Sequence, residues 1–410
     1  MASGAEECER TASGLRYPRQ MEMKVHHAID SIPESKWDAL LDAEATPFVR
    51  WAWLEALEAS GCASAENGWQ PCHLALWRGD RLIAAAPTYL KEGSDGDFSR
   101  DWAWADAALR AGIAYYPKLA VTVPFTPVTG RRLLIAPGED RATCVRALMA
   151  GARELAVELR ASSVHVLFPT AGEALELEAA GLARRVAFQY HWRNEGYADP
   201  EAFLACFSSK KRNQAKRERA APGEQGILIR TIRGEELAAD RHRWGRAAYD
   251  LHRSTVDKLM WGRRWLNGAF YDRVFARMPE SLEVVAATRD GKLIAGAFNV
   301  GTPSHLYGRY WGCFEEHPFL HFNVCLYHSI DECIRRGVGM FEGGAGGEHK
   351  IARGFQPAET WSNHLFLDAR LEKPIRAFVA AEAIERAAAL DRWRAASPIL
   401  KRKPVVQQDG

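Results

Sequence analysis

The chain has 410 residues, of which 47% are hydrophobic and 26% are charged, an ordinary composition for a globular protein. Its length predicts two or three domains with ample core. Its formal net charge of +2 excludes a global field that would attract nucleic acid or a membrane surface, so any anion binding must come from local patches.

Cysteine usage and the first residues bear on location. Eight cysteines occur singly and none belongs to a C-x-x-C pair, so the sequence predicts no metal cluster and no disulfide framework. Reduced thiols are typical of the cytoplasm, where we expect this protein. Residues 1–22 are polar and predict a disordered leader rather than a signal peptide. No apolar run approaches the length of a membrane span.

The first half of the chain predicts a sheet with helices. A strand is expected at 23–29, a helix starting near Pro33 and a second helix over 51–60. A hairpin with a charged turn at 78–81 follows. After the hairpin, apolar residues at helical spacing predict a helix over 139–160, and an apolar run predicts a buried strand over 164–168.

The same order of elements returns in the second half. A charged turn at 289–292 again joins two strands, followed by a predicted helix over 318–336 and a predicted strand over 338–341. This repetition favours a duplicated domain over coincidence. We therefore expect lobes at 23–195 and 196–372, followed by a terminal helix and tail over 373–410.

The densest run of positive charge lies between the two halves, at 208–219. It contains Lys210, Lys211 and Arg212 and a single acidic residue, Glu218. Serines at 208–209 suit the start of a helix, whose first turns would carry the cations. Two interpretations remain open: a phosphate clamp for a nucleotide-linked or RNA-linked substrate, or a solvated helix face.

A glycine-rich loop follows the predicted strand at 338–341. Gly343, Gly344, Gly346 and Gly347 occupy four of five positions, and a charged, helix-compatible segment runs on to Gly354. Such a loop can offer backbone N–H groups to an anion or to a developing oxyanion. The pattern matches neither the P-loop nor the dinucleotide-binding motif, and a tight turn with solvated charges is the alternative.

Titratable residues surround this loop. His349, Glu348 and Glu342 are the candidates for proton transfer, and Lys350 and Arg353 are candidates for holding a carboxylate or phosphate. The structural alternatives are a histidine paired with a carbonyl and a surface charge cluster. A further set of substrate-binding candidates, which core packing also explains, comprises Lys258, Trp261, Tyr307, Arg309, Trp311 and His321.

Several motifs resemble one family. They lie at 102–106 (Trp-Ala-Trp-Ala-Asp), 115–119, 124–130, 320–322, 341–345 and 347–355. Over about 24–390 the chain is similar to the FemAB-like branch of the GNAT acyltransferase superfamily, in the bacterial group labelled peptidoglycan biosynthesis/recognition. The resemblance implies an α/β (α+β) fold of tandem GNAT-like lobes, each a mixed sheet flanked by helices, and acyl transfer to an amine.

The resemblance leaves the donor open. FemAB relatives take an aminoacyl group from aminoacyl-tRNA and join it to an amine of a cell-wall precursor, whereas other GNAT proteins use acyl-CoA. The segment 310–318 lacks the [QR]-x-x-G-x-[GA] pattern of a CoA pyrophosphate loop. This chain also departs from its group, which usually has Gln at the position of Gly346 and Glu at that of Asn323.

Three functions are therefore compared. The first is an N-acyltransferase that moves an acyl or aminoacyl group to an amine, with tRNA as an expected partner. The second is an acetyl-CoA-dependent N-acetyltransferase. The third is a non-catalytic module that recognises a cell-wall precursor.

Overall fold

The computed structural model describes residues 21–258 and 263–396. The predicted leader, apart from its last two residues, the loose C-terminal tail and Trp261 lie outside these ranges. The chain forms two compact units. The N-terminal unit comprises the chain up to Ala187 with Trp265–Val274 and Thr360–Arg386, and the C-terminal unit comprises Phe188–Arg264, Phe275–Glu359 and the chain from Ala387 onward. The lobes 23–195 and 196–372 and the segment 373–410 stay predictions of domain boundaries.

The N-terminal unit is built on one long hairpin. Its arms are β2 (Trp69–Pro71) with β3 (His73–Arg78), and β4 (Arg81–Ala86) with β5 (Thr88–Lys91). Each arm is interrupted once, at Cys72 and at Pro87, but the Cys72 N–H still donates to the Thr88 carbonyl at 2.9 Å. Proline has no N–H to donate, which explains the break in the second arm.

The remaining strands of this unit extend the hairpin on both sides. Strand β1 (Glu22–His26) pairs antiparallel with β3, and the short β7 (Leu134–Ile135) pairs with β4. On the other side, β5 pairs antiparallel with β6 (Lys118–Val121), and β6 pairs parallel with β8 (Ser163–Leu167). The last strand is the second half of β15 (Gln356–Phe366), which pairs antiparallel with β8.

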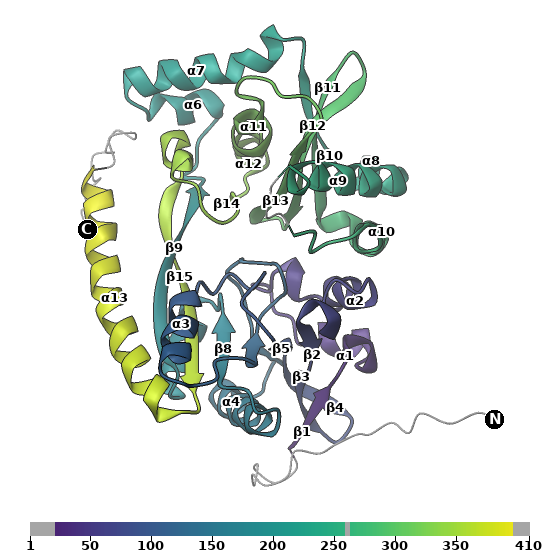
Figure 1. Cartoon of the computed structure of the whole chain (residues 1–410). Helices are drawn as coiled ribbons and strands as arrows, with labels where there is room; N and C mark the ends of the chain where they lie inside the picture. The colour runs from purple at the N-terminus through teal and green to yellow at the C-terminus, as the bar shows by residue number, and fades with distance from the viewer. Residues whose placement is uncertain (1–20, 259–262, 397–410) are drawn as a thin grey trace, which may run out of the picture. The chain divides into compact units, whose positions relative to one another are not determined.

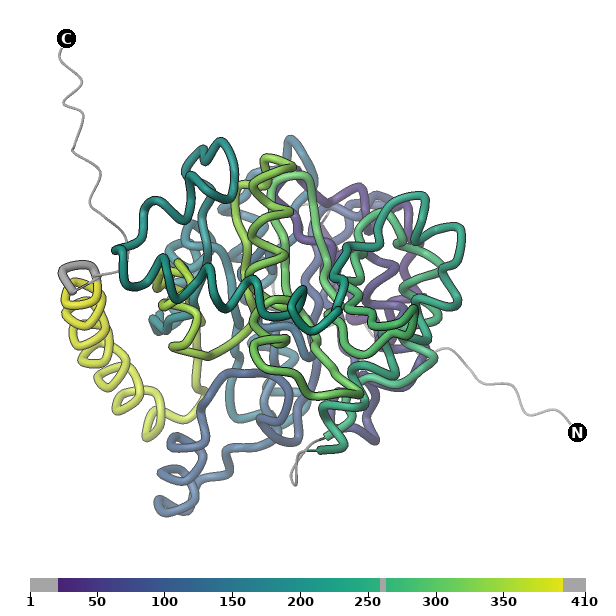
Figure 2. The backbone as a smooth tube through the Cα atoms, turned by 90° about the horizontal axis from the view of Figure 1, so that it is seen from above, coloured from purple at the N-terminus to yellow at the C-terminus, as the bar shows by residue number. Residues whose placement is uncertain are grey.

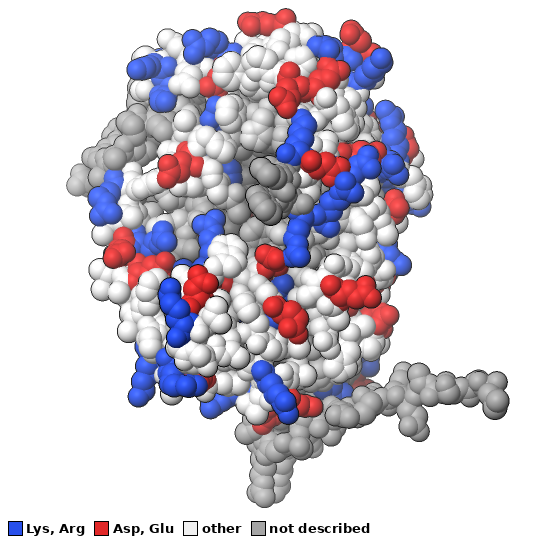
Figure 3. Space-filling model, in the orientation of Figure 1, with Lys and Arg blue, Asp and Glu red and all other residues white. Residues whose placement is uncertain are grey.

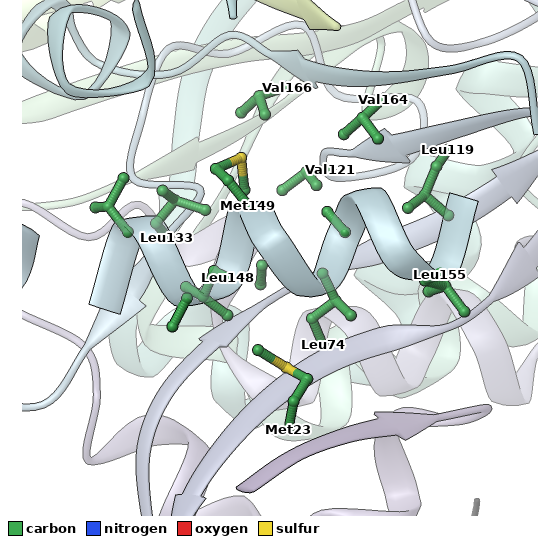
Figure 4. Close-up of a cluster of buried hydrophobic side chains, with 14 of the residues drawn as sticks. Met23, Leu74, Leu119, Val121, Leu133, Leu148, Met149, Leu155, Val164 and Val166 are labelled. Carbon is green, nitrogen blue, oxygen red and sulfur yellow. The ribbon is translucent and has the colours of Figure 1, made fainter. Parts of the chain in front are cut away.

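Helix α4 (Arg141–Glu158) covers this sheet. Figure 4 shows its Leu148, Met149 and Leu155 beside strand residues of the core. Gly151 lies on the same helix, where an added Cβ would come within 3.0 Å of the Met23 side chain, so its small size permits the close approach. The other helices of the unit are α1 (Glu34–Asp38), α2 (Trp51–Ala59), α3 (Trp102–Arg110), α5 (Ala171–Ala179), the start of α10 (Gly268–Arg277) and the start of α13 (Ala369–Ala396).

The C-terminal unit repeats this plan (Figure 1). Strands β10 (Leu228–Arg233), β11 (Leu282–Arg289), β12 (Lys292–Gly301) and β13 (His305–Cys313) pair antiparallel in that order. Strand β14 (Met340–Glu342) runs parallel to β13 and pairs antiparallel with the end of β9 (Ala183–Arg193). In each unit four strands thus pair antiparallel in succession, the fourth runs parallel to a fifth that follows it through a helix, and the fifth pairs antiparallel with a sixth. This agrees with the predicted duplication.

Helices also flank the second sheet. They are α6 (Pro200–Ala205), α7 (Ser209–Glu224), α8 (Gly234–Ala239), α9 (Arg241–Val256) and a helical stretch from Leu320 to Arg336. Figure 2, which views the molecule from above, shows α7 in teal running across this unit. The predicted 318–336 helix is not uniform. It consists of α11 (Leu320–Phe322), a π-helical turn (Asn323–Tyr327) and α12 (His328–Arg336). In the part of the chain that the structure describes, no helix is long and apolar enough to cross a membrane.

A buried ionic cluster stabilises the N-terminal unit. The fully buried Lys118 ammonium lies 2.8 Å from an Asp97 oxygen and 2.5 Å from an Asp101 oxygen. It also donates to the Ser94 hydroxyl at 2.7 Å. Burial alone would raise the pKa of Asp101, but the Lys118 charge lowers it below its usual value. The cluster therefore holds the 94–101 loop against β6.

Replacing Lys118 with Met should destabilise the protein by about 3–5 kcal/mol, because two buried carboxylates lose their cation. Urea unfolding measures the change. Lys24→Met is the matched control, since Lys24 forms a 3.7 Å pair with Glu22 on a partly exposed edge, and its effect should stay within about 0.5 kcal/mol. If the two substitutions lower the free energy of unfolding equally, the buried cluster stabilises the fold no more than an exposed ion pair does.

Candidate functional site

The candidate site lies where β13 and β14 separate. Their parallel pairing runs from His305 with Met340 to Tyr307 with Glu342, and the strands then diverge. Strand β13 also has a bulge, because Phe298 pairs with Tyr310 and Asn299 with Gly308, which leaves Arg309 unmatched. Bulges commonly redirect side chains next to active sites. A pocket of about 210 Å³ opens at this point.

The pocket is lined from three directions. Residues come from β12 and the bulged part of β13, from the helical stretch that begins at Leu320, and from the glycine loop with the segment after it. They are Ala297, Asn299, Gly308, Arg309, Tyr310, Trp311, His321, Cys325, Leu326, Gly343, Ala345, Gly346, Gly347, His349 and Lys350. The structure therefore brings eight of the predicted site residues into one pocket.

The glycine loop has the conformation that its composition predicts. Gly344, Gly346 and Gly347 have φ angles of 81°, 78° and 91°, a region that favours glycine. The charged segment after it forms a 3-10 helix (Glu348–Arg353) rather than an α-helix. So short a helix has little dipole, and it adds little to anion binding by the loop.

Lys350 holds the loop in place. Its ammonium donates to the Gly344 carbonyl at 2.6 Å and to the Gly346 carbonyl at 2.7 Å. The residue is only 5% exposed, and burial lowers its pKa to about 8. Two of its hydrogen-bond donors thus bind the protein itself, and a role in binding substrate stays a prediction.

Arg353 joins the segment after the loop to α7. Its guanidinium donates to Glu218 at 2.8 Å and to the His349 carbonyl at 2.9 Å, and it stacks 3.3 Å from the Phe322 ring centroid. Glu218 also accepts a 2.8 Å hydrogen bond from the Tyr327 hydroxyl. This buried arrangement makes Arg353 an anchor of the site, while its predicted contact with a substrate anion stays a prediction.

Two histidines face the pocket. His349 is exposed on one side, while the part of its ring that is shielded from water, followed by the charges of Lys350 and Arg353, lowers its pKa. Burial, followed by the charges of His349, Arg353 and Lys350, lowers the pKa of His321 to about 4. Trp311 contacts His321 edge-to-face, with ring centroids 5.0 Å apart. Both imidazoles are therefore neutral near pH 7, as a proton acceptor must be.

The other acid–base candidates lie outside the pocket lining. Glu342 is 6% exposed, and its carboxylate lies 3.7 Å from His191 Nε2. Glu348 is exposed beside the pocket. Two of the predicted substrate-binding residues also lie outside the pocket lining. Tyr307 is buried on β13, and Lys258 is exposed and pairs with Glu316 at 3.0 Å. Among the predicted catalytic residues that the structure describes, only His349 lines the pocket.

The basic run at 208–219 forms the N-cap and most of α7, a helix as predicted. Lys210 is exposed, whereas Lys211 and Arg212 are half-buried. Ser208 occupies the N-cap position, but its side chain makes no capping hydrogen bond. In Figure 3 several blue side chains gather over α7 at the upper left. Glu218 lies two turns after Lys211 on the same face of the helix, and Gln214 bridges the two by accepting from Lys211 and donating to Glu218. Helix α7 thus connects these cations to the anchor of the site.

Sequence reasoning missed several pocket residues. Asn299, Cys325 and Leu326 line it, yet each sits in a strand or helix that reads as core. Asn299 could have been singled out from the sequence, because its amide is the one polar side chain within the apolar run 293–300 of β12. The π-helical turn, which places Cys325 and Leu326 at the pocket, has no such signal in the sequence.

The pKa of Lys350 predicts a pH dependence. Its folded value of about 8 lies below the roughly 10.4 of an unfolded lysine, so between these values the unfolded chain holds more protons. Raising the pH across this window therefore favours the folded state. Urea unfolding at several pH values should show wild type gaining on the order of 2–3 kcal/mol over Lys350→Met from about pH 8 to about pH 10. A flat or falling difference would contradict the assignment.

Comparison with solved structures supports the fold. FemX is 12% identical, with a TM-score of 0.50 over 84% of this chain and 98% of that chain. A tandem GNAT protein from the clavulanic acid biosynthesis pathway is 17% identical, with a TM-score of 0.45 over 84% and 98%. L-PGS from Bacillus licheniformis is 8% identical, with a TM-score of 0.44 over 83% and 98%. No curated protein matches this chain. The predicted tandem GNAT-like fold is confirmed.

Comparison with family models identifies the family. The FemAB-like model, described as peptidoglycan biosynthesis/recognition, matches residues 28–401, which is most of the chain. Family and fold together support an acyltransferase type of function in peptidoglycan-related processes. The chain belongs to the FemAB-like family.

Proposed function

We propose that this protein is an N-acyltransferase that moves an aminoacyl or acyl group to an amine of a cell-wall precursor. The observation that carries the proposal is the separation of β13 and β14 beside the glycine loop. Where a strand ladder ends inside a unit, its backbone N–H and C=O groups can bind an extended substrate instead of a neighbouring strand. Here that point coincides with a pocket that contains a neutral histidine.

The size and charge of the pocket restrict what enters it. Its volume of about 210 Å³ is below the roughly 300–1,000 Å³ of sites for drug-sized ligands, so it suits one small group of a larger substrate. The lining residues include the cations Arg309 and Lys350 and no Asp or Glu. This lining favours an acyl carbonyl over an ammonium ion. The amine would therefore enter the pocket in its neutral form or lose its proton there.

The proposed reaction needs one proton acceptor. The amine nitrogen attacks the acyl carbonyl carbon, and the carbonyl π electrons move to oxygen. His349 accepts the proton that the nitrogen loses. The intermediate then collapses, forms the amide, and expels the ribose oxygen or the thiolate of the donor, which takes the proton from His349 and returns the imidazole to its neutral form. A histidine of lowered pKa is present in its basic form at neutral pH without further tuning.

Aminoacyl-tRNA is the donor that we propose. The segment 314–318, which precedes the helical stretch at Leu320, carries two carboxylates rather than a CoA-binding pattern. Its cationic neighbours are already engaged, since Arg289 binds Glu315 at 2.6 Å and Lys258 binds Glu316 at 3.0 Å. A CoA pyrophosphate would have to displace these pairs. The exposed cations of α7 instead suit an RNA backbone. Aminoacyl-tRNA is made in the cytoplasm, where we propose that the protein acts.

His349→Ala should lower kcat by roughly 10²–10⁴-fold, because the amine loses its proton acceptor. Mass spectrometry of acylated amine products, with aminoacyl-tRNA and acyl-CoA tried in turn, measures the change. His242→Ala is the matched control, since His242 is an exposed histidine of α9 in the same unit, and it should leave kcat unchanged.

Two further variants test the two glutamates that compete with His349 as the proton acceptor. Glu348→Gln and Glu342→Gln should each retain most of the activity, because neither side chain lines the pocket. Full activity of His349→Ala together with loss in either glutamine variant would move the base to that glutamate. A wild-type protein that transfers nothing to any amine would favour the non-catalytic recognition module.

Replacing Lys210, Lys211 and Arg212 together with Ala should weaken binding of aminoacyl-tRNA and make its salt dependence shallower, because fewer counterions are released. Filter binding at several salt concentrations measures both quantities. The control replaces Arg241, Arg243 and Arg246, which are exposed cations on α9 of the same unit. If both triple variants lose equal affinity, the effect of α7 is only one of net charge.

A further inference from the structure

Asn299 is an anomaly of the pocket. It lies on β12, lines the pocket and is 2% exposed. Within the residues that the structure describes, its Nδ2 group has no hydrogen-bond partner. Most buried side-chain donors in proteins are bonded, so each exception calls for a physical reason.

The side-chain donors of two other buried asparagines, Asn323 and Asn363, follow the usual rule. Asn323 Nδ2 donates to the Glu218 carbonyl at 2.8 Å and to the Phe319 carbonyl at 3.0 Å. Asn363 Nδ2 donates to the Ala174 carbonyl at 2.9 Å. An unbonded amide group at Asn299 costs folding stability, because it loses its hydrogen bonds to water without replacement. A ligand acceptor in the pocket would supply the missing partner.

The surroundings of Asn299 suit an acceptor that gains negative charge. The bulge lies between Phe298 and Asn299, and the strand position opposite is Gly308, which also lines the pocket. Arg309 and Lys350 line the same pocket. The side chains of His321 and Cys325, which line the same pocket, are partly withdrawn from water. A hydrogen bond to developing charge is strong in such surroundings.

We propose that Asn299 Nδ2 donates a hydrogen bond to the acyl carbonyl oxygen of the donor and stabilises the oxyanion that forms there. This inference rests on the proposed acyl transfer and assigns one of its groups. The amine nitrogen bonds to the carbonyl carbon, the oxygen takes the π pair, and Asn299 binds that oxygen. When the carbonyl reforms, the bond to the leaving oxygen or sulfur breaks. Asn299 gives up no proton, so it is the same before and after each turnover.

Two substitutions of nearly the same size test the assignment. Asn299→Leu removes the donor, and it should lower kcat roughly 10²–10³-fold while KM changes little. Its Tm should equal or exceed that of wild type, because an unbonded polar group is gone. Asn299→Asp keeps an acceptor in place but supplies negative charge where the oxyanion forms, and it should lower kcat at least as much. Steady-state kinetics and thermal melting are the measurements.

Asn363→Leu is the matched control, because that side chain is equally buried but its amide is bonded within the N-terminal unit. It should lower Tm and leave kcat unchanged below the melting transition. The inference is overturned if Asn299→Leu keeps full activity, if Asn299→Asp is active, or if Asn299→Leu lowers Tm as Asn363→Leu does. The proposed function would survive all three results. Absence of transfer by the wild-type protein would overturn both proposals.

Discussion

The two hydrogen bonds from Lys350 to the Gly344 and Gly346 carbonyls are the constraint on which the site depends. A loop of glycines has many accessible conformations and loses much entropy when it is fixed. A buried ammonium that bonds two of its carbonyls selects one of these conformations. That conformation places Gly343, Gly346 and Gly347 along the pocket, opposite β13. The lowered pKa of Lys350 reflects the burial that this arrangement requires.

A second buried charge fixes the segment that carries His349. Arg353 binds Glu218 of α7 and the carbonyl of His349 itself, and it stacks on Phe322 at the start of the helical stretch. Breaking such a buried pair on one side is costly, so the three elements hold one another in place. The cations of α7 are thereby connected to the segment that carries His349 through Glu218. Binding of an RNA backbone on α7 and chemistry in the pocket would act on the same rigid group of elements.

Much of the fold could be predicted from the sequence, because the spacing of hydrophobic residues and the charged turns specify strands and helices locally. The repeated hairpins, the helix over 139–160 and the positive φ angles of the glycine loop follow from such local rules. The roles of Lys350 and Arg353 do not. The sequence offered both as candidates for holding an anion or as members of a surface charge cluster, whereas the structure buries them in contacts with the protein. Arg353 pairs with Glu218, which lies 135 positions earlier in the chain, and Lys350 bonds carbonyls of the glycine loop. The π-helical turn and the unbonded amide of Asn299 likewise depend on tertiary packing, which no short stretch of sequence encodes.

A structure of the protein with a non-hydrolysable aminoacyl-RNA analogue tests the central claim most directly. The account predicts the acyl carbonyl oxygen in the pocket between β13 and the glycine loop, within hydrogen-bond distance of Asn299 Nδ2 and with the reacting carbon open to an amine beside His349. Density for the analogue elsewhere on the protein, with the pocket left empty, would contradict it.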